Sequence, residues 1–332
     1  MIETHVVNTF LAAGLREGGW FPLLNYANGL VAPSFLFIAG FVQGIERRTS
    51  PGKPINFQRR ASRLLGIVAL GYALHFPVAE LATHRWADAL RVGTQVDVLQ
   101  CLAIGLGFLL GLTWWVQRFA GRQSEAIWWG GVAVLAIASV LGAPLAQGWM
   151  GAPMALRAWF NGTTGSLFPL FPWIGFVFLG ALMGAWPERP VAERAAGIVG
   201  IAVLAWACRG PTFSAFSPAF FLERAAWVLA LAAICEWSAR RPLPAMFLYA
   251  GKHSLKLYVA HLALITTLVV AGVPVLVSGV PVVLALLAGV GAVSLGVAWF
   301  FERLPLFPAP SRPREELPSA AGESLSRLAS SP

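Results

Sequence analysis

The chain has 332 residues, of which 57% are hydrophobic and only 12% charged, and its mean hydropathy is +0.69. An ordinary globular domain carries about twice that charged fraction. The composition therefore excludes a soluble α/β enzyme, a disulfide-rich secreted module and, outside the C-terminal tail, a disordered chain. The net charge of +9 indicates membrane orientation instead of nucleic-acid binding, because the basic residues flank apolar runs and form no single patch.

Long charge-free runs predict membrane-spanning helices, since a helix needs about 20 apolar residues to cross a bilayer. The runs are apolar on every face, whereas the strands of a membrane barrel alternate. We therefore expect an all-α, polytopic helical membrane bundle of about ten transmembrane helices, the first one truncated. An apolar stub at residues 1–14 precedes nine predicted spans, at residues 28–45, 61–79, 97–116, 126–147, 167–186, 192–208, 219–239, 246–272 and 280–301.

The distribution of Lys and Arg predicts the orientation of the chain. With the stub counted as the first span, eighteen of these residues fall on one side of the membrane and six on the other. The positive-inside rule then puts both termini in the cytoplasm, and we expect a bacterial cytoplasmic (inner) membrane. Residues 1–304 form the predicted transmembrane domain. Residues 305–332, rich in Pro, Ser, Arg and Glu, form a predicted disordered cytoplasmic tail.

Small residues and cysteines yield two structural expectations. The GxxxG pairs Gly40/Gly44, Gly107/Gly111 and Gly180/Gly184 predict close helix–helix contacts. The three cysteines lie in or beside apolar runs, and no CxxC or Cys/His cluster occurs, so we expect neither a disulfide framework nor a metal site.

Polar residues inside apolar spans are costly and therefore informative. Ser254, Tyr258 and His261 follow a spacing of i, i+4, i+7 and share one helix face, with His261 about 10 Å deeper than Ser254. A buried imidazole at that depth suits a general acid or base. The alternative is a neutral histidine bonded to a neighbouring helix, with Ser254 as N-cap. His5 faces the same cavity as His261 if the first helix begins upstream; otherwise it is interfacial.

Each of the other polar groups has one structural and one functional interpretation. Asp97 and Gln100 have the spacing of a capping box, and the alternative role is binding a polar acceptor. Basic side chains near the cytoplasmic side serve as topology determinants and lipid contacts, or bind a phosphorylated ligand. They are Arg59, Arg60, Arg63, Lys252 and Lys256.

Five segments in a fixed order resemble the heparan-α-glucosaminide N-acetyltransferase catalytic-domain family of membrane acyltransferases, together with His5 at the end of the first helix. They are NGLVAPSFLFIAG at 28–40, RRASRLLG at 59–66, DVLQCLA at 97–103, FPLFPWIGFVFLG at 168–180 and GKHSLKLYVAH at 251–261. The family's first helix usually carries an Asp…Arg-Gly motif before the histidine, and this sequence lacks it.

The resemblance implies an integral membrane enzyme that moves an acyl group, typically acetyl, from cytoplasmic acyl-CoA to a sugar amine or hydroxyl on the other side. No cofactor is bound, and acyl-CoA is the co-substrate. The resemblance also implies that His5 and His261 are the catalytic residues. Contacts with acyl-CoA are assigned to Arg59, Arg60, Lys252, Ser254 and Lys256, and contacts with the acceptor to Asp97, Gln100 and Trp173.

Two other functions remain open at this stage. A transporter or flippase would use the same polar cavity without acyl transfer, although no internal repeat supports it. A catalytically inactive scaffold is the third interpretation, favoured if Met1 is the true start of the protein. The expected partners are membrane lipid, acyl-CoA and a sugar or glycan acceptor, and a homo-oligomer is compatible with the sequence.

Overall fold

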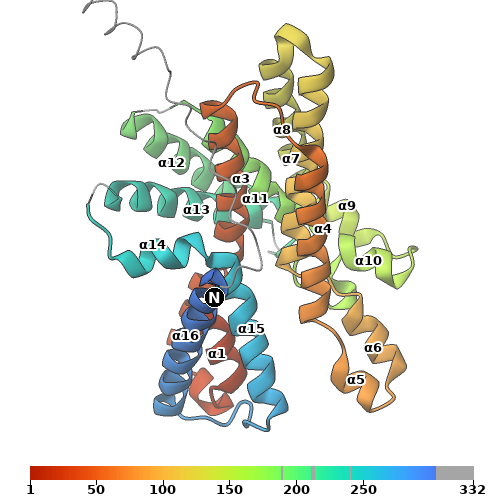
Figure 1. Ribbon diagram of the computed structural model, residues 1–332, viewed down its shortest axis with the longest axis vertical. Coiled ribbons are helices and arrows are strands. Elements are labelled where there is room, and N and C mark those ends of the chain that lie inside the picture. The colour runs from red at the N-terminus through yellow and green to blue at the C-terminus, as the bar shows by residue number, and fades with distance from the viewer. Residues whose placement is uncertain (188–189, 211–213, 240, 304–332) are drawn as a thin grey trace, which may run out of the picture.

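The structure is a computed structural model that describes residues 1–187, 190–210, 214–239 and 241–303 (Figure 1). Within these ranges the regular secondary structure is helical, which confirms the predicted all-α bundle. Five helices are long and apolar enough to cross a membrane, or six if the bent pair α14–α15 is one span. The count of ten therefore stays a prediction, and the predicted tail at 305–332 lies outside the described residues.

Sixteen α-helices are found in the described part of the chain. They are α1 (Ile2–Phe10), α2 (Trp20–Asn28), α3 (Val31–Thr49), α4 (Phe57–Leu74), α5 (Val78–Ala82), α6 (Trp86–Gly93), α7 (Val98–Phe119), α8 (Ser124–Leu141), α9 (Ala143–Gly148), α10 (Met154–Phe160), α11 (Leu170–Ala185), α12 (Val191–Ala207), α13 (Pro218–Ser238), α14 (Ala245–Lys252), α15 (Ser254–Val270) and α16 (Val280–Arg303). Most predicted spans contain one of these helices, with bounds shifted by a few residues.

Three predicted spans differ from the structure. The span at 61–79 ends early, because α4 stops at Leu74. The span at 126–147 is divided into α8 and α9 at Gly142. The span at 246–272 is two helices, α14 and α15, which meet at His253 with a bend of 81°. The bend falls within the polar segment GKHSLK at 251–256, which the prediction placed inside a single span.

Glycines hold α3 and α11 in direct backbone contact at the centre of the molecule. A Cβ on Gly40 or Gly44 would overlap with the carbonyl oxygen of Val177 or Ala181 in α11. A Cβ on Gly180 or Gly184 would likewise overlap with backbone atoms of α3. Two of the three predicted GxxxG contacts, Gly40/Gly44 and Gly180/Gly184, are therefore confirmed, and they face each other. Close backbone approach of this kind replaces the hydrophobic effect, which does not draw helices together in lipid.

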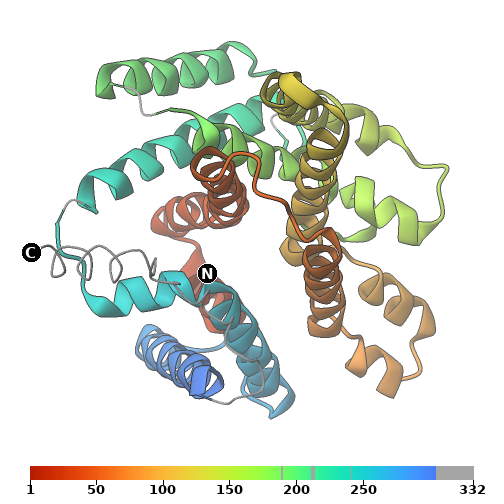
Figure 2. The ribbon, with the colours of Figure 1, turned by 45° about the horizontal axis from the view of Figure 1, so that its top comes forward.

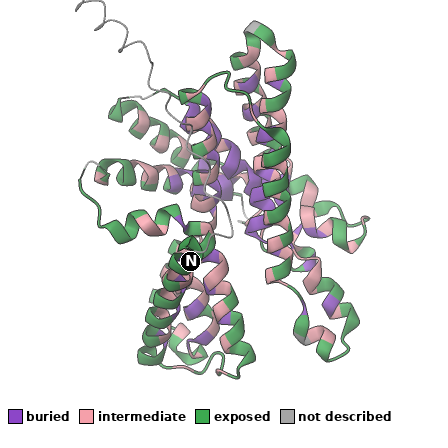
Figure 3. Ribbon diagram, in the orientation of Figure 1, coloured by how far each residue is buried: buried purple, intermediate pink, exposed green. Residues whose placement is uncertain are grey.

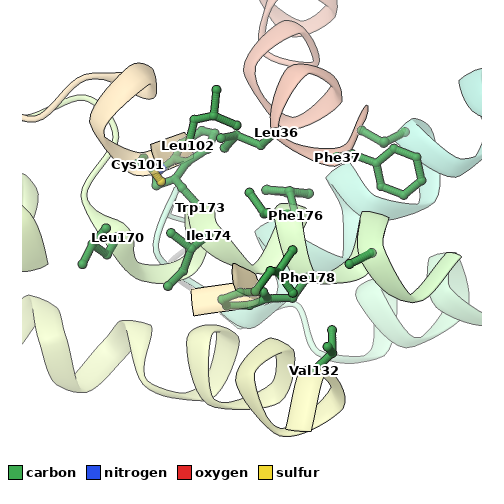
Figure 4. Close-up of a cluster of buried hydrophobic side chains, with 14 of the residues drawn as sticks. Leu36, Phe37, Cys101, Leu102, Val132, Leu170, Trp173, Ile174, Phe176 and Phe178 are labelled. Atoms are coloured by element: carbon green, nitrogen blue, oxygen red, sulfur yellow. The ribbon is translucent and has the colours of Figure 1, made fainter. Parts of the chain in front are cut away.

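The main hydrophobic core surrounds this contact. Figure 3 shows the buried residues gathered where α3, α7 and α11 meet, with exposed residues along the outer helices. In Figure 4, side chains from these helices and from α8 interdigitate around Phe176 and Phe178, both of which are fully buried. Cys101 is buried in the same cluster, and the cysteines form no disulfide in the described residues.

A second, smaller core joins α1, α15 and α16, which lie together at one end of the molecule (Figures 1 and 2). Val6 and Phe10 of α1 are buried there against Ile265 and Val283. A short parallel bridge closes this end, since the amide of Ser278 donates to the carbonyl of Phe10 and that of Ala12 to the carbonyl of Ser278. The N-terminal stub is therefore packed against the last two helices of the described chain.

Candidate functional site

The first histidine lies on α1, which is fixed at its C-terminal end. The Arg16 guanidinium donates to the carbonyl oxygens of Val7, Asn8 and Leu11, each at 3.0 Å. The carbonyl of Val7 also accepts from the Leu11 amide, and those of Asn8 and Leu11 lie at the helix end, where a cation is favourable. Capping by Arg16 and burial of the neighbouring Val6 hold His5 in a defined position.

His5 and His261 come together although 256 positions of the sequence separate them. Their ring centroids are 5.2 Å apart and the rings are tilted by 48°. His261 is 1% exposed. Its Nδ1 lies 2.8 Å from the carbonyl oxygen of Leu257, one turn earlier in α15. A carbonyl can only accept, so Nδ1 carries the hydrogen and Nε2 presents the lone pair of a neutral imidazole.

The Nε2 atom of His261 has no hydrogen-bond partner among the described residues. Buried polar atoms without a partner are uncommon in folded proteins, and each one needs an explanation. A substrate group that donates a hydrogen bond would provide the missing partner. The atom is thus oriented and available to accept a proton.

A polar contact joins this histidine helix to the start of α7. The Tyr258 hydroxyl donates to Oδ2 of Asp97 at 2.6 Å, and both side chains are buried. The Asp97 amide donates to Oε1 of Gln100 at 3.1 Å, and with the reciprocal contact from the Gln100 amide to the Asp97 side chain the predicted capping box is confirmed. Because Tyr258 and His261 share a helix face, this contact fixes the part of α15 that carries His261. The Nε2 atom of Gln100 is buried without a partner among the described residues.

His75 is a further histidine that the sequence did not single out. It ends α4, and its Nδ1 lies 3.2 Å from the carbonyl oxygen of Gly71. It interacts electrostatically with His5, as do His261 and Asp97. A Cβ on Gly71 would meet the side chain of Gln100, so the glycine lets α4 approach α7 at this level. The sequence held a signal for it, because His75 is a polar residue inside the predicted span at 61–79.

The residues expected to bind acyl-CoA fall into two groups on different helices. Arg60 makes an ion pair with Glu46 and lies in a pocket of about 40 Å³ that Arg47 and Lys53 also line. Arg59 is exposed beside it. Lys252, Ser254 and Lys256 lie at the bend between α14 and α15, and Lys252 pairs with Glu302 at 3.6 Å. Helices α4 and α14 lie on different sides of the molecule (Figures 1 and 2).

The structure places Trp173 in the main core instead of on an open surface. It is 7% exposed, and its ring packs against Phe168 and Phe220 at centroid distances of 4.9 and 5.7 Å. Its Nε1 atom has no hydrogen-bond partner in the described part of the chain. Ser254 is the first residue of α15, and His253 occupies the N-cap position that the sequence assigned to Ser254. In the described part of the chain, no group of three or more His, Cys, Asp or Glu side chains is placed to hold a metal ion.

Comparison with known proteins matches residues 1–209 to the family described as heparan-alpha-glucosaminide N-acetyltransferase, catalytic. The match includes His5, Arg60, Asp97 and Trp173, whereas His261 lies beyond it. Neither the curated proteins nor the solved structures yield a match to the chain. The matched region covers well over half of the sequence and contains α1 to α12. The chain therefore belongs to the heparan-alpha-glucosaminide N-acetyltransferase catalytic-domain family of multi-pass membrane proteins.

Proposed function

We propose that the protein transfers an acetyl group from acetyl-CoA to an amine or hydroxyl of a sugar, with His5 and His261 at the reacting centre. Family membership supports the reaction type. The observation that carries the choice of residues is the buried, unpartnered Nε2 of His261 beside the ring of His5. Two imidazoles in a dry setting can pass a proton at neutral pH without a metal.

In the proposed reaction, Nε2 of His261 removes a proton from the acceptor nitrogen or oxygen as that atom attacks the thioester carbonyl carbon. A bond forms between the acceptor atom and the carbonyl carbon, and the bond between that carbon and sulfur breaks. The leaving CoA thiolate takes the proton from the imidazolium, so the histidine returns to its neutral state. His5, with its ring 5.2 Å from that of His261, orients the acceptor or shares the proton.

The proposed orientation places acyl-CoA on the cytoplasmic side and the sugar on the opposite side of the inner membrane. The eighteen-to-six distribution of Lys and Arg supports this, with both termini in the cytoplasm. Arg59 and Arg60 provide guanidinium groups for the CoA phosphates. A second polar cluster for acyl-CoA is formed by Lys252, Ser254 and Lys256. The free amide nitrogen of Gln100 and the carboxylate of Asp97 bind the acceptor near the histidines, and the free indole nitrogen of Trp173 donates to it.

The test is CoA release by the purified protein in nanodiscs, supplied with acetyl-CoA and a glucosamine-terminated oligosaccharide. We compare wild type with His261→Ala and His5→Ala. His84→Ala is the matched control, because His84 lies in an exposed loop between α5 and α6. We expect each site variant to lose activity by about 100-fold or more, the contribution of a general base, and the control to retain it.

Two outcomes would overturn parts of the proposal. Full activity in both histidine variants would remove the histidines from the reaction. Movement of the oligosaccharide across proteoliposomes without any release of CoA would instead support the transporter interpretation and contradict acyl transfer.

A further inference from the structure

An apolar groove lies between α4, α7 and α8, apart from the histidine site. Its volume is about 760 Å³, far larger than the polar pocket around Arg60. The lining is apolar throughout and comes from all three helices. Phe57 and Leu64 of α4, Gly107 and Gly111 of α7, and Gly131 and Val134 of α8 are among the lining residues.

Two glycines of α7 form the floor of this groove, and here the predicted close helix contact is wrong. A Cβ on Gly111 would have no neighbouring atom within 4 Å, and one on Gly107 would meet only a methyl group of Leu64 at 3.9 Å. Because glycine has no side chain, Gly107 and Gly111 leave open space here, and no other helix of the described chain approaches to fill it. A groove of this shape admits a flexible hydrocarbon chain.

The cytoplasmic end of the groove has the features of a headgroup site. Phe57 of the lining packs against Trp114 at a centroid distance of 5.6 Å, and Trp114 is 43% exposed. Tryptophan at this level is typical of the membrane–water interface. Arg118 lies 11 residues after Gly107, which at 100° per residue puts both on the same face of α7. Arg118 is exposed, about two helical turns beyond Gly111 and about three beyond Gly107.

We propose that this groove binds one phospholipid with an anionic headgroup, its acyl chain between α4, α7 and α8 and its phosphate beside Arg118. The charge selects the occupant, because a cation at the mouth of an apolar groove complements a lipid that is negatively charged on the cytoplasmic leaflet. A second protein chain would instead need a broad face that extends beyond a groove. The proposal is independent of the acyl-transfer reaction.

Native mass spectrometry of the detergent-purified full chain tests this site, with phosphatidylglycerol and phosphatidylcholine of identical acyl chains as probes. We expect one tightly held lipid, with phosphatidylglycerol bound about fivefold more tightly, the effect of one basic residue near an anionic headgroup. Arg118→Gln should abolish that preference. Arg241→Gln is the matched control, since both arginines are exposed and each lies over an aromatic ring, Arg118 over Phe119 and Arg241 over Trp237.

Filling the groove tests the acyl-chain site separately. Gly111→Phe should remove the bound lipid of either kind, with Gly111→Leu as a second filling variant if the larger side chain lowers the yield. Gly130→Phe is the matched control, because Gly130 of α8 has open space around it and lies outside the groove. Equal affinity for the two lipids, or a lipid retained in Gly111→Phe and Gly111→Leu as in Gly130→Phe, would overturn the proposal.

Discussion

The contact between α3 and α11 and the surface shared by α4 and α7 carry the same GxxxG motif with opposite results. In the first, Gly40, Gly44, Gly180 and Gly184 face each other, and the helix backbones touch. In the second, Gly107 and Gly111 face a groove of about 760 Å³. The motif allows a close approach but does not supply the partner. Whether a glycine pair becomes a contact or a cavity depends on the side chains of the opposing helix.

The largest effect should come from adding one methyl group to the α3–α11 contact. The Cβ of Gly180→Ala would overlap with backbone of α3, which cannot yield as a flexible side chain can. We expect a loss of about 3 kcal/mol or more in the free energy of unfolding, at the upper end of overpacking effects. Thermal unfolding of the detergent-purified variant measures it. An unchanged unfolding temperature would show that the two helices are not in backbone contact.

A polar helix contact should give an intermediate effect. Tyr258→Phe removes the hydroxyl that donates to Asp97 and leaves a buried carboxylate oxygen without that partner. We expect a loss of about 1–3 kcal/mol in unfolding free energy, the cost of an unsatisfied buried acceptor. Denaturant unfolding measures the loss. Tyr26→Phe is the comparison variant, because it removes a tyrosine hydroxyl that also donates to a carboxylate, that of Glu223, at an exposed position on α2. If Tyr258→Phe unfolds like wild type, α15 is held by other contacts.

The smallest effect should be a gain in stability, and it separates the two glycine surfaces from each other. Gly111→Ala adds the same methyl group as Gly180→Ala, but into open space. Alanine loses less backbone freedom on folding than glycine, so we expect a gain of about 0.5–1 kcal/mol. Thermal unfolding under the same conditions measures the difference between the two variants. A destabilised Gly111→Ala would mean that another helix packs on this face after all.

Much of the fold could be predicted from the sequence because its signals are local. Apolar length identified the helices, and the bounds of α7, α11 and α13 lie within a few residues of the predicted spans. The bend at His253 was missed, although Lys252, Ser254 and Lys256 interrupt the apolar pattern there, because the apolar residues on both sides together have the length of one span. The groove was missed as well, since an isolated GxxxG motif does not reveal what faces it.

For the site, scarcity of polar residues was the useful signal. It singled out His5, Asp97 and His261 against an apolar background, and the structure brings the two histidines together. The partners of these residues could not be predicted, because the Tyr258–Asp97 contact joins positions 161 residues apart. Such contacts depend on how α15 packs against α7. His75 shows the limit of the approach, since it lies inside the predicted span at 61–79 and its position at the end of α4 appears only in three dimensions.

Single-turnover kinetics test whether the pair formed by buried His261 and half-buried His5 performs acyl transfer. Purified protein is mixed with radiolabelled acetyl-CoA and acceptor, and acetylated product is counted for wild type, His261→Ala and the exposed-loop control His84→Ala. The account predicts that His261→Ala loses about 100-fold or more in rate while remaining folded, and that His84→Ala keeps the wild-type rate. Equal rates in all three proteins would contradict it.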